Sequence, residues 1–186
     1  MKKTAIILGN GVEEGEVLTI ADIIRRANFT CDLVGLEKTI TGGHHITIMC
    51  DQVLNESIKD YDMIILPGGY GGVDEMCKSP LLLSILQDMY KAGKYVTAIC
   101  AAPIVLEKAG VLEGKKWTAY RGYEEKISMG TFVDEKVVID GNLITSRGPA
   151  TCYAFAYKLV DVLGGDSLAV KKRMVYFNAF DVKEDE

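Results

Sequence analysis

Short apolar runs alternate along the chain with segments whose apolar residues recur every three or four positions. The runs at 4–8, 29–36, 46–50, 62–66 and 95–99 have the length and composition of strands, several of them buried on both faces. The segments at 17–24, 81–90, 101–109 and 151–163 have helical spacing, and a further short helix follows them. Strands that alternate with helices predict an α/β fold around a mainly parallel sheet.

The second half of the chain adds a predicted β-hairpin. Two apolar runs, 137–139 and 143–145, flank Asp140-Gly141-Asn142, a sequence typical of a tight turn. No repeat, linker or low-complexity stretch interrupts the pattern, and the chain ends in an acidic tail at 181–186. We therefore predict a single domain over residues 1–186.

Three loops follow predicted strands, at 9–16, 67–72 and 100–103. Ligands of open α/β sheets bind outside the carboxyl ends of the strands, where such loops meet. The sequence thus predicts that these three loops converge on one crevice.

Composition narrows the functional classes. The 186 residues are 48% hydrophobic and 25% charged, which is typical of a globular protein, and the net charge of -5 disfavours nucleic acid and anionic membranes as partners. No apolar run approaches the roughly 18–20 residues of a membrane span. Five scattered cysteines without a C-x-x-C pair argue against a disulfide framework or structural zinc. We expect reduced thiols in the cytoplasm, with no metal or other cofactor.

Cys100 is the strongest candidate for chemistry. It lies between the apolar strand 95–99 and the next helix, flanked by Ala101 and Ala102, with Pro103 at an early helical position. Such a sharp strand-to-helix turn exposes a nucleophile, and a helix N-terminus lowers the pKa of a thiol. The alternative is a small buried hydrophobic residue, since unpaired cysteines are usually buried. The residues alone leave both interpretations open.

Five motifs occur in order along nearly the whole chain. They are G-x-G-x-E-E-x-E at 9–16, I-I-R-R-A at 23–27, L-P-G-G at 66–69, A-I-C-A-A-P at 98–103 and T-S-R-G-P-A-T at 145–151. Together they resemble the DJ-1/PfpI (ThiJ) superfamily, and within it the compact DJ-1-like branch. The resemblance implies a flavodoxin-like three-layer sandwich and a homodimer.

The resemblance also implies site residues. Cys100 matches the reactive cysteine of the family, and Glu16 matches the glutamate whose side chain meets the thiol. A carboxylate and a thiolate in contact share a proton, so a protonated Glu16 could stabilise a thiolate or a sulfinate. Gly68 and Gly69 match the loop that faces the cysteine, and their N–H groups with that of Ala101 could form an oxyanion hole. We interpret the neighbouring Glu13 and Glu14 as solvated charges at a helix start.

The chain departs from the family at a histidine that many relatives place near the cysteine. Tyr120, on the predicted strand 116–120, stands at that position, and His44 and His45 are the only histidines. The resemblance places His44 where it could reach the cysteine pocket of a partner subunit, as an anion-binding or proton-transfer group. The alternative is a histidine exposed in a turn. Without a histidine base near Cys100, protease-type activation of the thiol is disfavoured.

Three functions remain open. The first is a glutathione-independent enzyme of stress protection, glyoxalase-like or deglycase-like, that acts on small reactive carbonyls through Cys100 and Glu16. The second is a redox-sensing stress-response protein whose cysteine is oxidised to a sulfinate without significant turnover. The third, less favoured, is a cysteine peptidase or amidase of the PfpI type. The expected partners are a small aldehyde or an oxidant and a second copy of the chain, with no nucleic acid and no membrane.

Overall fold

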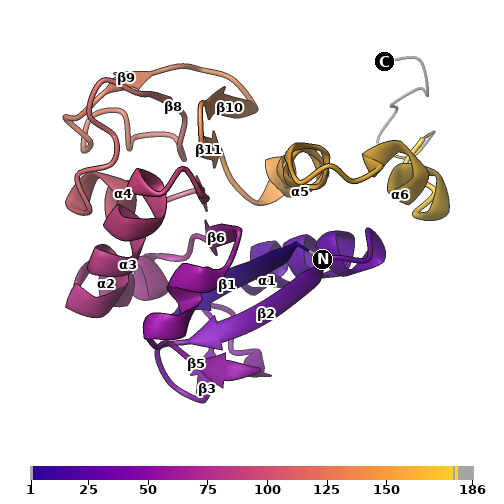
Figure 1. Cartoon of the computed structure of the whole chain (residues 1–186), viewed down its shortest axis with the longest axis horizontal. Helices are drawn as coiled ribbons and strands as arrows, with labels where there is room; N and C mark the ends of the chain where they lie inside the picture. The colour runs from indigo at the N-terminus through magenta and orange to yellow at the C-terminus, as the bar shows by residue number, and fades with distance from the viewer. Residues whose placement is uncertain (1, 178, 180–186) are drawn as a thin grey trace.

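A seven-stranded sheet forms the centre of the computed structural model, which describes residues 2–177 and 179 (Figure 1). In spatial order the strands are β10 (Val137–Asp140), β11 (Leu143–Ser146), β7 (Tyr95–Ile99), β6 (Met63–Leu66), β1 (Lys3–Leu8), β2 (Thr30–Gly35) and β5 (Gln52–Val53). Neighbouring strands run parallel except β10 and β11, which form the predicted hairpin around Gly141 and Asn142. The sheet is mainly parallel, as the sequence predicts.

Helices cover both faces of this sheet (Figure 1). One layer holds α1 (Glu14–Arg26), α5 (Cys152–Val162) and α6 (Ser167–Arg173), and the other holds α2 (Tyr70–Cys77), α3 (Pro80–Lys91) and α4 (Pro103–Lys108). The short 3-10 turn η1 (Glu56–Asp60) packs against α3, and η2 (Pro149–Thr151) leads into α5. Three layers with this strand order are a flavodoxin-like sandwich, which confirms the predicted fold class.

Two further pairs of strands lie outside the central sheet. The antiparallel pair β3 (Thr39–Thr41) and β4 (Thr47–Met49) forms a hairpin whose turn carries His44 and His45. The pair β8 (Lys116–Trp117) and β9 (Thr131–Phe132) is parallel. The predicted strand at 116–120 is therefore shorter than expected, because the chain turns away after Trp117 and Tyr120 bonds to the backbone of Cys100 instead.

The hydrophobic pattern explains the central elements. Residues 4–8 of β1 are completely buried, as expected for a strand covered on both faces. On α1, Val17, Ile20 and Ile24 turn one apolar face to the core, while acidic residues begin the helix and basic residues end it. The buried residues form one continuous cluster from β1 to α6, and the single domain over residues 1–186 stays a prediction.

The segment after β6 differs from the sequence prediction. Residues 67–72 were expected to form a loop, yet α2 begins at Tyr70. A Cβ on Gly71 would lie 2.8 Å from the carbonyl oxygen of Asn10, and one on Gly72 would lie 3.0 Å from Cα of Val12. The glycines thus let α2 pack closely against the loop after β1. The predicted acidic tail at 181–186 lies outside the described residues, and no described helix combines the length and apolar character needed to cross a bilayer.

Candidate active site

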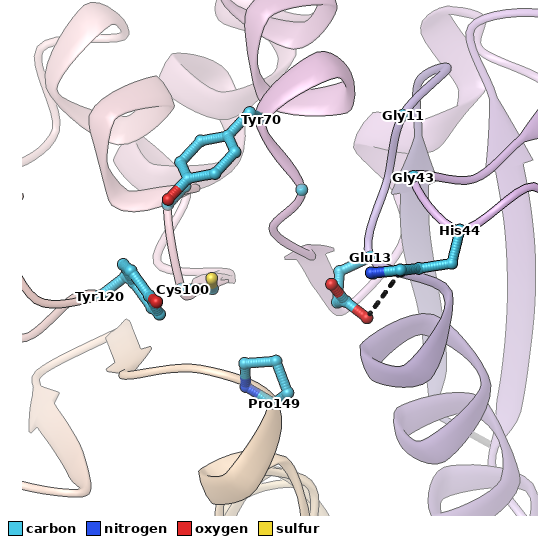
Figure 2. Close-up of a pocket in the computed structure, with 10 residues that line it drawn as sticks. Gly11, Glu13, Gly43, His44, Tyr70, Cys100, Tyr120 and Pro149 are labelled. Carbon is cyan, nitrogen blue, oxygen red and sulfur yellow. Dashed lines mark ion pairs between the residues drawn. The ribbon is translucent and has the colours of Figure 1, made fainter.

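The carboxyl ends of β1, β6 and β7 meet at one pocket, as the sequence predicts. Gly11 follows β1, Gly69 follows β6 and Cys100 follows β7, and all three line a cavity of about 290 Å³. Pro149, at the start of η2, closes another side. In Figure 2, Cys100 lies between Tyr120 on one side and the pair Glu13 and His44 on the other.

Cys100 occupies a strained backbone position. Its φ of 64° lies in the left-handed region, which costs a residue with a Cβ on the order of 1–2 kcal/mol. Two backbone hydrogen bonds hold it there. The N–H of Cys100 donates to Ser146 O at 3.1 Å, and its carbonyl accepts from Tyr120 N–H at 2.8 Å. The surrounding structure therefore enforces the sharp turn that the sequence predicts.

Glu16 lies beneath the cysteine in the first turn of α1. Its side chain is completely buried, and Oε2 accepts a hydrogen bond of 2.7 Å from the N–H of Gly68. A Cβ on Gly68 would lie 2.9 Å from the sulfur of Cys100 and 3.1 Å from Oε2 of Glu16. Glycine at position 68 is thus required for the thiol and the carboxyl group to approach the same point.

Burial raises the pKa of Glu16 to about 7, although hydrogen bonds from Gly68 and the Cys100 thiol partly oppose this shift. Burial and the charge of Glu16 raise the pKa of Cys100 to about 12. The backbone N–H groups of Ala101 and Gly69 lower this pKa, but their effect is smaller. Burial therefore outweighs the lowering of the thiol pKa that we expected from the helix N-terminus. At neutral pH, Glu16 is divided between acid and carboxylate next to a thiol.

Glu14 corrects the sequence interpretation of the helix start. We expected a solvated charge, but Glu14 is only 2% exposed. Its Oε1 accepts hydrogen bonds from the backbone N–H groups of His44 at 2.7 Å and Ile46 at 3.2 Å. Its Oε2 lies 3.0 Å from Nδ1 of His44. The carboxylate therefore fixes the β3–β4 hairpin to α1 from within the protein.

These contacts make Glu14 a stabilising charge. Burial alone would raise its pKa, but hydrogen bonds from its own N–H, from the His44 side chain and from the hairpin backbone lower the pKa to about 2. The pKa of Glu14 is lower in the folded state than its ordinary value of 4.5. Its charge therefore stabilises the folded protein above about pH 4.5, and this stabilisation is lost as the pH falls towards 2.

We expect Glu14→Gln to reduce the free energy of unfolding at pH 7 by about 1–3 kcal/mol, because charge-assisted hydrogen bonds become neutral ones. Its stability should also change less than that of the wild type between pH 4.5 and pH 2. Urea unfolding across this pH range measures both effects. The control is Asp22→Asn on the exposed side of the same helix, which removes only an exposed ion pair with Arg26. If the free energy of unfolding depends on pH in the same way in both variants, Glu14 is not the stabilising charge.

His44 lines the pocket of its own chain and is highly exposed, with 71% of its side chain accessible. Its hydrogen bond to Glu14 and the charge of Glu13 raise the pKa of His44. Nδ1 of His44 lies 3.7 Å from Oε1 of Glu13 (Figure 2). That His44 reaches the pocket of a partner subunit stays a prediction.

Glu13, Glu14 and His44 are the one group of potential metal ligands that gathers within 4.8 Å among the described residues. Both oxygens of Glu14 already have protein partners within hydrogen-bonding distance, so the cluster is explained without a cation.

Residues 2–162 match the DJ-1/PfpI family, and the chain belongs to this family. It is 39% identical to the protein dj-1beta of Drosophila melanogaster over 88% of this chain and 90% of that one. The crystal structure of Drosophila DJ-1beta superposes with a TM-score of 0.90, covering 94% of this chain and 98% of the other.

Two relatives carry names that state an activity. The chain is 32% identical to Deglycase PH1704 of Pyrococcus horikoshii, over 87% of this chain and 99% of the relative. It is 31% identical to the glutathione-independent glyoxalase DJR-1.2 of Caenorhabditis elegans, over 88% of this chain and 90% of that relative.

The structure thus brings together Cys100, Glu16, Gly68, Gly69 and Ala101, all of which the sequence selected. It adds Glu13 and Tyr70, which line the same pocket. The sequence indicates only a solvated charge at Glu13, and it predicts a loop where Tyr70 begins α2. None of the other cysteines in the described part of the chain lines this pocket, whether buried like Cys31, Cys50 and Cys152 or partly exposed like Cys77. Arg147 of the last motif forms an ion pair with Asp134.

Proposed function

We propose that this protein converts small 2-oxoaldehydes to 2-hydroxy acids without glutathione, using Cys100 as nucleophile and Glu16 as proton carrier. The supporting observation is a buried carboxyl group with a pKa of about 7 beside a strained cysteine that faces a small pocket. A group with this pKa can both accept and return a proton near neutral pH. The names of the glyoxalase and deglycase relatives point to the same chemistry.

The reaction begins when the sulfur attacks the aldehyde carbon. The C–S bond forms as the carbonyl electron pair moves to oxygen, while the thiol proton passes to the carboxylate of Glu16 and then to that oxygen. The N–H groups of Gly69 and Ala101, which act on the sulfur in the free protein, are suited to stabilise the developing charge. The product of this step is a hemithioacetal on Cys100.

Glu16 then removes the proton from the carbon that carries sulfur and returns it to the neighbouring carbon, while the hydroxyl proton of the hemithioacetal moves to the oxygen of that neighbouring carbon. This isomerisation passes through an enediolate and gives a thioester of the 2-hydroxy acid. Water hydrolyses the thioester, which releases the acid and restores the thiol. The net change is the addition of one water molecule to the oxoaldehyde. A deglycase activity would use the same pair on a carbonyl adduct of an amine.

We expect purified protein to form lactate from methylglyoxal in buffer free of glutathione, with lactate measured by chiral chromatography. Methylglyoxal deuterated at the aldehyde carbon should leave part of its label on carbon 2 of lactate, because Glu16 is shielded from solvent. Lactate no higher than with heat-inactivated protein would refute the proposal. Complete loss of the label to solvent would refute the shielded transfer.

A second function has one specific observation in its favour. Oε1 of Glu16 is buried and has no hydrogen-bond partner among the described residues. When protonated, this carboxyl group can donate to an oxygen on an oxidised Cys100, and such a bond would stabilise a sulfinate. Peroxide would transfer one oxygen to the thiolate with release of water, and a second equivalent would give the sulfinate.

We expect mild peroxide to add one and then two oxygen atoms to Cys100 before any other cysteine, as measured by intact mass and peptide mapping. Cys77 is the internal control, because it is partly exposed and lacks a comparable carboxyl partner. Oxidation of Cys77 ahead of Cys100 would contradict the sensor function.

The predicted homodimer and the cytoplasmic location belong to this proposal as well. Sedimentation equilibrium should give twice the mass of the chain, and a monomer would refute the predicted dimer.

A further inference from the structure

A second cavity, of about 440 Å³, adjoins the cysteine pocket. Tyr120 and Pro149 line both cavities, so the two spaces share a wall. Figure 2 shows both residues around Cys100, with Tyr120 on the side away from Glu13 and His44. We call the second cavity the basic groove, because Arg121, Lys136 and Arg147 line it.

The basic groove is positively charged in a protein whose net charge is negative. The protein carries a net charge of -5, yet no carboxylate among the described residues lines this cavity. Arg147 is paired with Asp134, an exposed side chain whose ion pair is worth little in water. Arg121 and Lys136 are exposed and form no ion pair within the described part of the chain. The groove therefore keeps a positive charge.

Two of these cations directly follow residues whose backbone is hydrogen-bonded to Cys100. Arg147 directly follows Ser146, whose carbonyl accepts the N–H of Cys100 at 3.1 Å. Arg121 directly follows Tyr120, whose N–H donates to the carbonyl of Cys100 at 2.8 Å. Each arginine thus follows a residue whose backbone is hydrogen-bonded to that of Cys100.

We propose that the basic groove binds an anionic end group, a phosphate monoester, of a substrate whose carbonyl reacts at Cys100. This inference rests on the proposed function, and it identifies the substrate class as phosphorylated small carbonyl compounds. A dianion matches a groove with three cations better than a single carboxylate does. Guanidinium groups also bind phosphate oxygens in pairs, which fixes orientation as well as affinity.

The site can be tested without turnover. Glycerol 3-phosphate is titrated into isotope-labelled protein, and amide resonances of Gly148, Ala150 and Thr151 report binding in the groove. We expect saturable shifts with glycerol 3-phosphate, weaker ones with glycerate and none with glycerol, and weakening at higher salt. Equal affinity for glycerate and glycerol 3-phosphate would overturn the assignment to phosphate.

The critical variant is Arg121→Gln with Lys136→Gln, which leaves Arg147 and the backbone contacts of Cys100 in place. The matched control is Lys91→Gln with Lys158→Gln, which removes two exposed positive charges outside the groove. We expect the groove variant to lose at least about tenfold in affinity for glycerol 3-phosphate, because each cation contributes a charge-assisted hydrogen bond. The control variant should bind as the wild type does. Equal losses in both would overturn the inference.

Kinetics separate this inference from the proposed function. The phosphate ester of hydroxypyruvaldehyde should have a higher kcat/KM than methylglyoxal, and the groove variant should lose this preference while it keeps its activity on methylglyoxal. Turnover of methylglyoxal, without binding of glycerol 3-phosphate and without a preference for the phosphate ester, would refute the phosphate site in the groove and leave the proposed reaction intact. Groove-dependent binding of glycerol 3-phosphate without any turnover would support the subsite and refute the proposed reaction.

Discussion

We expect Cys100→Ala to lower kcat/KM for methylglyoxal by about a thousandfold or more, because the variant cannot form the covalent hemithioacetal. Glu16, the N–H groups and the pocket remain, but none of them can replace a nucleophile. The measurement is lactate formation at several substrate concentrations, with folding checked by near-UV circular dichroism. Cys100→Ser should be almost as inactive, since a hydroxyl is a much weaker nucleophile than a thiol.

The control for this prediction is Cys77→Ala, which removes a more exposed thiol and should keep nearly full activity. Methylglyoxal also reacts with thiols without catalysis, so the control distinguishes turnover from consumption. A loss of less than about tenfold in Cys100→Ala would refute covalent catalysis.

Glu16→Gln should give two opposite effects. We expect kcat/KM to fall by about 10²–10⁴-fold, the usual contribution of a general acid–base group. We also expect the free energy of unfolding above pH 7 to rise by roughly 2–3 kcal/mol, because the buried charge is removed while the side-chain oxygen still accepts from Gly68. A gain in stability with a loss of activity is characteristic of a residue kept for function.

The pH dependence follows from the raised pKa of Glu16, about 7 in the folded state against an ordinary value of 4.5. Between these values the folded protein binds more protons than the unfolded chain, so this group makes stability fall as the pH rises. The wild type should lose stability over this range, and Glu16→Gln should not. Glu14→Gln is the contrast on the same helix turn, since it is expected to destabilise the protein. Destabilisation by both variants at pH 8 would refute the assignment for Glu16.

The sequence predicts six of the seven strands of the central sheet and most helices because their apolar pattern is strong and local, and it misses the two-residue edge strand β5. It fails for α2, whose first turn contains Gly71 and Gly72 and lacks an apolar stripe. The glycines are explained only by the close approach to Asn10 and Val12, residues far away in the sequence. The strand β9 is also missed, because it has only two residues, and its partner β8 is only the first part of the predicted strand 116–120.

For the site, sequence motifs identify the groups that touch the sulfur, while burial and charge are known only from the structure. Glu13 and Glu14 are adjacent and chemically identical, yet only Glu14 is covered by the hairpin. A Cβ on Gly42 would lie 2.1 Å from Cδ of Glu14, so Gly42 is the residue of the sequence that indicates this contact. The thiol pKa was expected to be lowered, because the sequence cannot show how deeply a residue is buried.

The two buried carboxyl groups of α1 constrain how the chain folds. Their backbone partners come later in the sequence, His44 after 30 residues and Gly68 after 52. Until the hairpin and β6 have emerged during synthesis, docking of α1 on β1 would enclose two carboxyl groups without their backbone hydrogen-bond partners, which is unfavourable. Cys100 emerges later still and is an ordinary solvated thiol until β7 adds to the sheet. Its reactivity therefore belongs to the completed fold alone, and a nascent or partly unfolded chain exposes five cysteines without that distinction.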